Sequence, residues 1–131
     1  MVSPIASAER RWMAEPWWME SARLAALRLG ASTRAQRGAH HSVYVVLLHN
    51  PIRAQPLGLY VGQTSRDPDW RFDQHKLGYK ASGAVKRFGV RTLPELTQHL
   101  NPMQGWEAID LEAALADALR SASVPWVEGG H

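Results

Sequence analysis

The 131-residue sequence contains no cysteine, which excludes disulfide bridges, thiolate zinc sites, iron–sulfur clusters and a cysteine nucleophile. Any metal ion bound by this chain therefore needs oxygen or imidazole ligands. The sequence also lacks a run of about eighteen consecutive apolar residues, the length that a membrane-spanning helix requires. Glu9, Arg10 and Arg11 stand where a signal peptide would carry its apolar core. We therefore expect a cytoplasmic protein that does not associate with membranes.

The length and the hydrophobic content of 45% suit one hydrophobic core and are too small for two. The charges are segregated along the chain. Residues 63–92 hold seven Lys and Arg against three Asp, whereas residues 93–131 hold one Arg against six acidic residues. A basic central stretch suits a polyanion such as nucleic acid, although ordinary solvated faces would give the same counts.

Residues 1–40 are interpreted as a helical N-terminal extension followed by a linker. The extension is rich in Ala, Leu, Arg and Glu, its tryptophans and leucines offer an apolar face, and Pro16 is expected to break it into two helices. The stretch from Gly30 to Gly38 has no apolar period and is typical of a linker. The tryptophans of this segment are interpreted as a packing device or as a docking face, through which residues 1–40 could bind a second copy of the chain to form a homodimer, or another protein partner.

Residues 41–131 predict one α+β domain. Two short apolar runs, Val43–Leu48 and Leu59–Gly62, predict strands that pair as a hairpin. A helix is expected to open at Asp67-Pro68-Asp69 and to close at Gly78. The other expected elements are a short helix at 81–89, a third strand at 90–96 in which Pro94 favours an edge position, an amphipathic helix at 106–120 and an extended end at 124–130.

Several of these predicted elements carry side chains that could take part in catalysis or bind a metal ion. Tyr44 and Tyr60 lie in the two hairpin strands, where one face would present both hydroxyls, although tyrosine also packs well in strands for structural reasons alone. Arg71 and His75 are four residues apart on the first helix and therefore share a face. Glu112 lies in the middle of the last helix beside the apolar stripe, where a carboxylate needs a partner, a metal ion or a route to solvent.

In this order and at these spacings the residues resemble the GIY-YIG nuclease family, in particular its small stand-alone bacterial members. The match extends over residues 42 to about 130. Ser42-Val43-Tyr44 and Tyr60-Val61-Gly62 correspond to the two triplets that name the family, Arg71 and His75 to the polar residues of the first helix, and Glu112 to the metal-binding glutamate. Many members also carry an Asn after this glutamate, and the corresponding region here contains none.

The resemblance implies a three-stranded antiparallel sheet flanked by helices and a metal-dependent endonuclease that hydrolyses phosphodiester bonds in DNA. Glu112 would hold one divalent cation, Mg²⁺ or Mn²⁺, because hard carboxylate oxygens suit these ions. Arg71 would bind the phosphate with its planar guanidinium, and His75 would relay a proton. Tyr44 or Tyr60 would act as general base or orient the water, and the pattern does not decide between them.

Basic residues near these positions are candidates for contact with the nucleic acid backbone, or equally for solubility. They are Arg66, Lys76, Lys80, Lys86 and Arg87. Two other functions fit the same motifs, namely an RNase or nuclease toxin and a non-catalytic nucleic-acid-binding module of the same fold. No feature of the sequence reads a base edge or a 2′-hydroxyl recognisably, so the choice between DNA and RNA rests on the resemblance alone.

Overall fold

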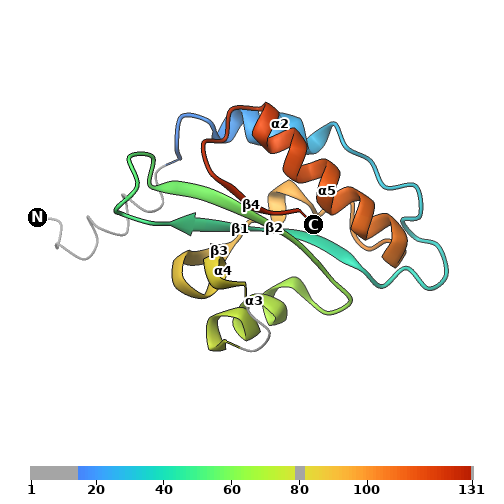
Figure 1. Cartoon of the computed structure of the whole chain (residues 1–131). Helices are drawn as coiled ribbons and strands as arrows, with labels where there is room; N and C mark the ends of the chain where they lie inside the picture. The colour runs from blue at the N-terminus through green and yellow to red at the C-terminus, as the bar shows by residue number, and fades with distance from the viewer. Residues whose placement is uncertain (1–14, 79–81, 131) are drawn as a thin grey trace, which may run out of the picture.

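The computed structural model describes residues 15–78 and 82–130, and within them helices cover both faces of a four-stranded sheet (Figure 1). The elements are, in order, α2 (Met19–Leu27), β1 (Ser42–His49), β2 (Leu57–Thr64), α3 (Pro68–Leu77), α4 (Gly83–Phe88), β3 (Gly89–Thr92), the 3-10 helix η1 (Pro94–Leu96), α5 (Gly105–Ser121) and β4 (Val127–Gly129). The predicted α+β class is confirmed. In the described part of the chain no helix combines the length and hydropathy needed to cross a membrane.

The sheet has the strand order β3-β1-β2-β4 and is mixed. Strand β1 is antiparallel to both β2 and β3, whereas β4 runs parallel to β2 through Leu59 to Val61. The expected sheet had three antiparallel strands, so the fourth strand is a difference. It has a physical reason, since β4 satisfies backbone groups of β2 that would otherwise form an unpaired edge. Gly129 permits this approach, because a Cβ there would lie 2.0 Å from the Val61 carbonyl oxygen.

The third strand is shorter than predicted. Strand β3 ends at Thr92, and after Leu93 the backbone turns into η1. The prediction of a strand up to Leu96 is therefore wrong in its second half. Pro94 is the cause, since it has no N–H for a sheet ladder and its restricted φ suits the first position of a helix. The predicted edge position is confirmed, because β3 ends the sheet beside β1.

The helices predicted from the sequence are confirmed in the described part of the chain. Helix α3 begins after Asp67, whose side chain accepts hydrogen bonds from the backbone N–H groups of Asp69 and Trp70, and it ends at Gly78. The short helix α4 and the long helix α5 lie where they were expected. The first helix predicted before Pro16 lies outside the described residues, as does Trp12.

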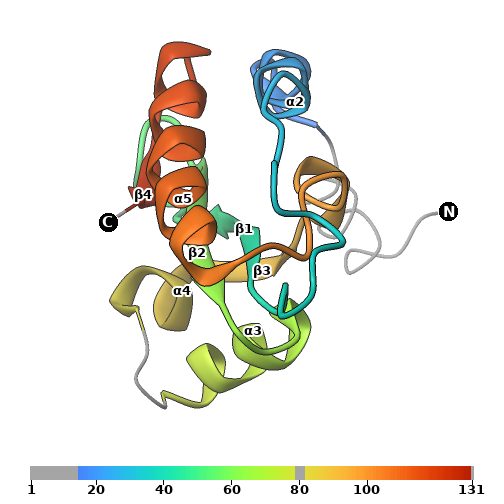
Figure 2. The same ribbon diagram turned by 90° about the vertical axis from the view of Figure 1, so that its right-hand side faces the viewer.

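The two faces of the sheet carry different layers. Residues Val45, Leu47, Leu59 and Val61 point to the face covered by α2 and α5, which lie side by side in Figure 2. The alternate positions of β1 face α3 and α4. Because β1 is buried on both faces, its sequence is a continuous apolar run, as is typical of a central strand.

Helix α2, predicted as part of the N-terminal extension, contributes to the main core. Trp18, Ala22 and Ala26 are buried in the same cluster as Leu115 and Leu119 of α5. Packing of this helix against α5 and η1 therefore removes apolar surface from water on both sides of the contact. The division of the chain at residue 40 stays a prediction.

The segment predicted as a linker is attached to the start of α5. The carboxylate of Glu107 accepts hydrogen bonds from the backbone N–H and the hydroxyl of both Ser32 and Thr33, at 2.6 to 2.9 Å. These donors hold the pKa of Glu107 well below its usual range, at about 2. Residues 32 and 33 are thus held to α5 by charge-assisted hydrogen bonds rather than by apolar packing.

Candidate active site

The hairpin of β1 and β2 places the two tyrosines on the same face of the sheet. In its register Tyr44 lies opposite Gly62, and Val46 lies opposite Tyr60. Tyr44 and Tyr60 are therefore diagonal neighbours, and their ring centroids are 6.1 Å apart. Both belong to the layer between the sheet and helices α3 and α4.

Gly62 makes the space for this pair of rings. A Cβ at Gly62 would lie 2.6 Å from both Cζ and Oη of Tyr44, and 2.9 Å from Cε1 of Tyr60. No side chain fits at this position without displacing one of the phenols. The glycine of the second triplet is thus explained by the space that the two tyrosine rings occupy.

Helix α3 brings His75 against the tyrosines. The His75 side chain is buried, with its Nε2 at 3.0 Å from Oη of Tyr44 and its ring centroid 5.8 Å from that of Tyr60. The other ring nitrogen, Nδ1, accepts a hydrogen bond of 2.9 Å from the backbone N–H of Ser82. Three of the residues predicted from the sequence therefore meet in one cluster, in which Tyr44 and His75 are buried and Tyr60 is half-buried.

Arg71 and Glu112 act on this cluster through their charges. Burial raises the pKa of Tyr44 far above its usual value, and Tyr60 adds to this shift. Burial also raises the pKa of Tyr60, and the negative charge of Glu112 adds to it. Arg71 lowers the pKa of both phenols. For His75, burial lowers the pKa to about 4, and the positive charge of Arg71 adds to the lowering.

Glu112 belongs to α5, which covers the opposite face of the sheet from α3. Its negative charge nevertheless raises the pKa of both tyrosines. Its side chain is buried although it carries a carboxylate. Among the described residues no three His, Asp or Glu side chains form a cluster that could hold a metal ion by themselves. A hard cation at Glu112 would therefore complete its coordination with water and with substrate oxygens.

The start of β1, next to Tyr44, is held by a side chain that the sequence did not single out. The amide of Asn101 accepts a hydrogen bond from the Val43 N–H at 2.9 Å and donates one to the Val43 carbonyl at 2.8 Å. Beyond the end of β3, this amide thus replaces a neighbouring strand. No local signal predicts this, because the two residues are far apart in the sequence.

Ser82 is a second residue that the sequence did not single out. Its backbone N–H donates to His75, and its Oγ accepts from the Val85 N–H at the start of α4. Its hydroxyl also lowers the pKa of Tyr60. The available signal was a serine before a short helix, which predicts an N-cap. The contact with His75 comes from the packing of α4 beside α3.

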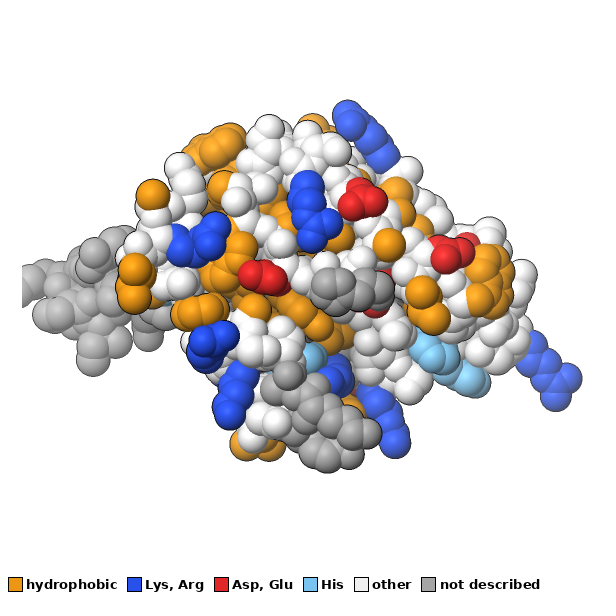
Figure 3. Space-filling view, viewed as in Figure 1, with side chains coloured by type: hydrophobic (Ala, Val, Ile, Leu, Met, Phe, Trp, Pro, Cys, Tyr) orange, Lys and Arg blue, Asp and Glu red, His pale blue; other side chains and the backbone are white. Residues whose placement is uncertain are grey.

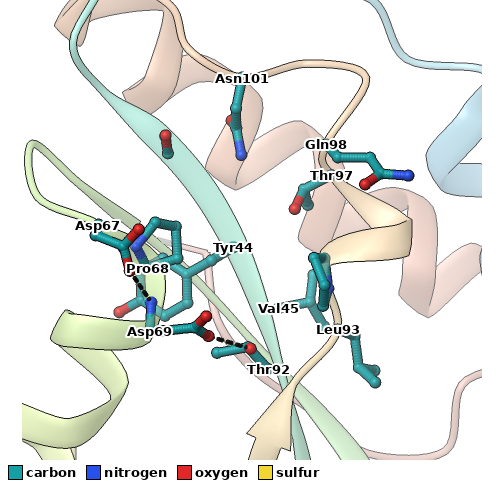
Figure 4. A pocket seen from close by; sticks show the side chains of 12 residues that line it. Tyr44, Val45, Asp67, Pro68, Asp69, Thr92, Leu93, Thr97, Gln98 and Asn101 are labelled. Atoms are coloured by element: carbon teal, nitrogen blue, oxygen red, sulfur yellow. Dashed lines mark hydrogen bonds between the residues drawn. The ribbon is translucent and has the colours of Figure 1, made fainter.

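A pocket of about 270 Å³ adjoins Tyr44 (Figure 4). It lies between the first half of β1, the start of α3 and the segment from Thr92 to Asn101. Two of its carboxylates already have partners, since Asp67 caps α3 and Asp69 accepts a hydrogen bond of 2.5 Å from Thr92. Among the described residues that line this pocket there is no Lys or Arg.

On the face shown in Figure 3, basic side chains lie over α3 and α4 and also over the α5 side of the molecule, whereas the acidic side chains in view lie on the α5 side. Arg66 stacks over Trp70, with its Cζ 5.4 Å from the ring centroid, and Trp70 is itself partly exposed. Arg87 donates to the carbonyl of Gly83 and also lies against Phe88. These two arginines, one before α3 and one in α4, are therefore anchored side chains.

The predicted lysines differ in their surroundings. Lys76 donates from Nζ to the carbonyls of Lys86 and Gly89, at 3.1 and 3.0 Å, and so links α3 to the end of α4. Lys86 is exposed. Lys80 lies outside the described residues.

Comparisons of this chain with protein-family models, with curated proteins and with solved structures found no match. The resemblance to GIY-YIG nucleases therefore rests on the residues quoted above and stays a prediction.

Proposed function

We propose that this protein is a metal-dependent endonuclease of the GIY-YIG type that hydrolyses phosphodiester bonds in DNA. One observation carries the proposal: residues chosen from separate sequence motifs meet at one place. Tyr44, Tyr60 and His75 are in contact, and the charges of Arg71 and Glu112 act on their ionisation. Four elements supply these five side chains. The packing of a hydrophobic core does not by itself require two phenols and two charged groups at one place.

The electrostatics support a role with an anionic substrate. The positive charge of Arg71 acts on both phenols and on His75, and its guanidinium is the group of this site that would bind a phosphate. The carboxylate of Glu112 is the hard oxygen ligand that Mg²⁺ or Mn²⁺ prefers. A divalent cation bound there would supply charge stabilisation at phosphorus and a more acidic water.

The charges of Arg71 and Glu112 affect whether the two phenols can ionise. Both phenols are neutral at pH 7, and burial raises their pKa values further above the ordinary value of 10. The positive charge of Arg71 opposes the shift, and neutralisation of Glu112 by a cation would remove its contribution. Loss of the Glu112 charge through a bound cation would lower the phenol pKa values and so raise the share of phenolate, the form that can accept a proton from water.

Binding of the nucleic acid backbone is assigned to the basic surface over α3 and α4. Arg66, Lys86 and Arg87 would contact phosphates without selecting a sequence. The affinity of a cleavage-deficient variant should then fall steeply as salt is added, since each neutralised phosphate releases counterions.

The test is cleavage of single-stranded and duplex DNA and RNA by the purified protein with Mg²⁺, Mn²⁺ or EDTA. Glu112→Gln removes the charge at nearly constant shape, and Arg71→Ala removes the guanidinium. The matched control is Asp117→Asn, because Asp117 is an exposed carboxylate on the same helix. We expect metal-dependent cutting of DNA that falls by about a hundredfold or more in the two site variants and is unchanged in the control.

Other results would assign another function. Cutting confined to RNA would identify an RNase or a nuclease toxin. Salt-sensitive binding with no cutting of any substrate would identify a non-catalytic nucleic-acid-binding module. Full activity in Glu112→Gln and Arg71→Ala would overturn the proposed site.

A further inference from the structure

The hydrogen bonds of His75 fix the orientation of its ring. The side chain is 2% exposed, and each ring nitrogen has one protein partner. The backbone N–H of Ser82 lies 2.9 Å from Nδ1, and the Tyr44 hydroxyl lies 3.0 Å from Nε2. Turning the ring by half a turn would place carbon atoms against both partners, so this orientation alone satisfies them.

The partner at Nδ1 also determines where the proton lies. A backbone N–H can only donate, so Nδ1 must present its lone pair to Ser82. The neutral ring then carries its proton on Nε2, from which it donates to the Tyr44 oxygen. The ring is neutral at pH 7, because burial lowers the pKa of His75 to about 4.

We propose that Ser82 is a positioning residue of the nuclease site, whose backbone N–H holds His75 in the Nε2–H tautomer. His75 is then a hydrogen-bond donor to Tyr44 and does not take a proton from it. This replaces the proton relay expected for His75 with an orienting role. The catalytic consequence rests on the proposed function, whereas the tautomer does not.

The direction of this bond leaves the Tyr44 proton pointing away from His75. Because its oxygen accepts from His75, the Tyr44 hydroxyl can donate its own proton to another acceptor. The Tyr60 ring is its neighbour, with centroids 6.1 Å apart. The Ser82 hydroxyl lowers the pKa of Tyr60, so Ser82 acts on His75 through its backbone N–H and on Tyr60 through its hydroxyl.

Two substitutions separate the two contacts of Ser82. Ser82→Ala removes the hydroxyl and keeps the backbone N–H. Ser82→Pro removes both, and proline suits this position because the φ of Ser82 is −65°. The comparison of the two variants therefore isolates the N–H that faces His75.

The decisive readout is the ¹⁵N spectrum of the His75 ring at pH 7, assigned by its loss in His75→Gln. We expect an unprotonated Nδ1 and a protonated Nε2 in the unaltered protein and in Ser82→Ala, with a through-bond coupling from the Ser82 N–H to Nδ1. In Ser82→Pro the signal should shift toward the other tautomer. A protonated Nδ1 in the unaltered protein would overturn the proposal, as would identical ring spectra for the two variants.

Cleavage measurements test the catalytic consequence separately. Loss of one hydrogen bond that orients the site should lower kcat of Ser82→Pro roughly tenfold below that of Ser82→Ala. Equal kcat values in an active protein would contradict the positioning role. An unaltered protein that cuts no substrate would refute the proposed function instead, and the ring spectra would still decide the tautomer.

Discussion

Tyr44 shows how one side chain serves both the core and the candidate site. Its ring belongs to the apolar cluster between the sheet and α4, while its hydroxyl contacts His75 and its edge lines the neighbouring pocket. Burying a phenol costs free energy unless its hydroxyl is hydrogen-bonded, so the contact with His75 stabilises the fold as well as orienting the group. Single substitutions in this cluster must therefore be measured for stability and for activity.

Gly62→Ala tests the space between the two phenols. The added Cβ would overlap with the hydroxyl end of Tyr44, so one tyrosine must move. We expect a loss of about 1–3 kcal/mol in unfolding free energy from overpacking. Cleavage should fall by about a hundredfold, since the reacting groups are displaced. Urea unfolding and cleavage assays measure the two effects.

The control is Gly30→Ala, because a Cβ there meets no atom within 4 Å. This variant should match the unaltered protein in both assays. Normal cleavage by Gly62→Ala would show that the tyrosine geometry does not matter for the reaction.

The low pKa of His75 predicts a pH-dependent stability. In the folded protein its pKa is about 4, below the ordinary value of 6.5, so protonation favours the unfolded chain. The contribution of the neutral ring to stability is complete above pH 6.5 and is lost as the pH falls toward about 4. Unfolding free energies measured across this range should therefore decline toward acid.

His75→Gln is the comparison, because glutamine keeps a polar side chain and does not titrate. The difference in stability between the two proteins should shrink or reverse as the pH falls. A difference that stays constant with pH would contradict a buried neutral His75.

At the scale of elements, the site depends on contacts that anchor strands and helices to one another. Lys76 joins α3 to the end of α4, Glu107 joins the segment before β1 to α5, and Asn101 holds the start of β1. Each replaces a backbone partner or satisfies a helix end with a side chain. The positions of Tyr44 and His75 follow from these connections.

Asn101→Asp tests the anchor of β1. The carboxylate still accepts from the Val43 N–H, but its second oxygen faces the Val43 carbonyl, where Asn101 donated. We expect unfolding free energy to fall by about 1–3 kcal/mol, the cost of an unsatisfied and repelled acceptor. Chemical denaturation at neutral pH measures it.

Asn50→Asp is the matched control, since the Asn50 side chain accepts from the Ile52 N–H and a carboxylate can do the same. Its stability should change little. Equal stability of both variants would show that the amide of Asn101 does not anchor the strand.

At the scale of the whole molecule, α2 and the sheet share one core. Trp18 is 1% exposed and packs in the main cluster, whereas the adjacent Trp17 is 69% exposed. Trp18→Ala should cost about 3–5 kcal/mol of unfolding free energy, since a large cavity is left. Trp17→Ala should stay within about 0.5 kcal/mol of the unaltered protein. Thermal and urea unfolding compare the two.

This pair also tests whether residues 1–40 form a separable extension. A core that includes Trp18 predicts that removal of residues 1–40 exposes apolar surface of α5 and destabilises the remainder. A truncated chain with unchanged stability, or a Trp18→Ala variant no weaker than Trp17→Ala, would show that α2 is dispensable. Binding of a partner through this helix stays a prediction.

The sequence by itself determined most elements and the positions of the candidate residues. The apolar runs of β1 and β2, the Asp67 cap with Gly78, and the periodicity of α5 are local patterns, and local patterns set local backbone geometry. The spacing of Arg71 and His75 likewise placed both on one helix face. These features need no knowledge of the rest of the chain.

Tertiary structure alone decided the parallel pairing of β4, the anchor at Asn101 and the contact of Ser82 with His75. The first two join groups that are far apart in the sequence, and the third depends on how α4 packs beside α3, so local patterns do not contain the signal. It also decided the burial of Tyr44 and His75, which determines their pKa shifts. Desolvation and hydrogen-bond partners depend on which surfaces meet, and that is settled only when the whole core has packed.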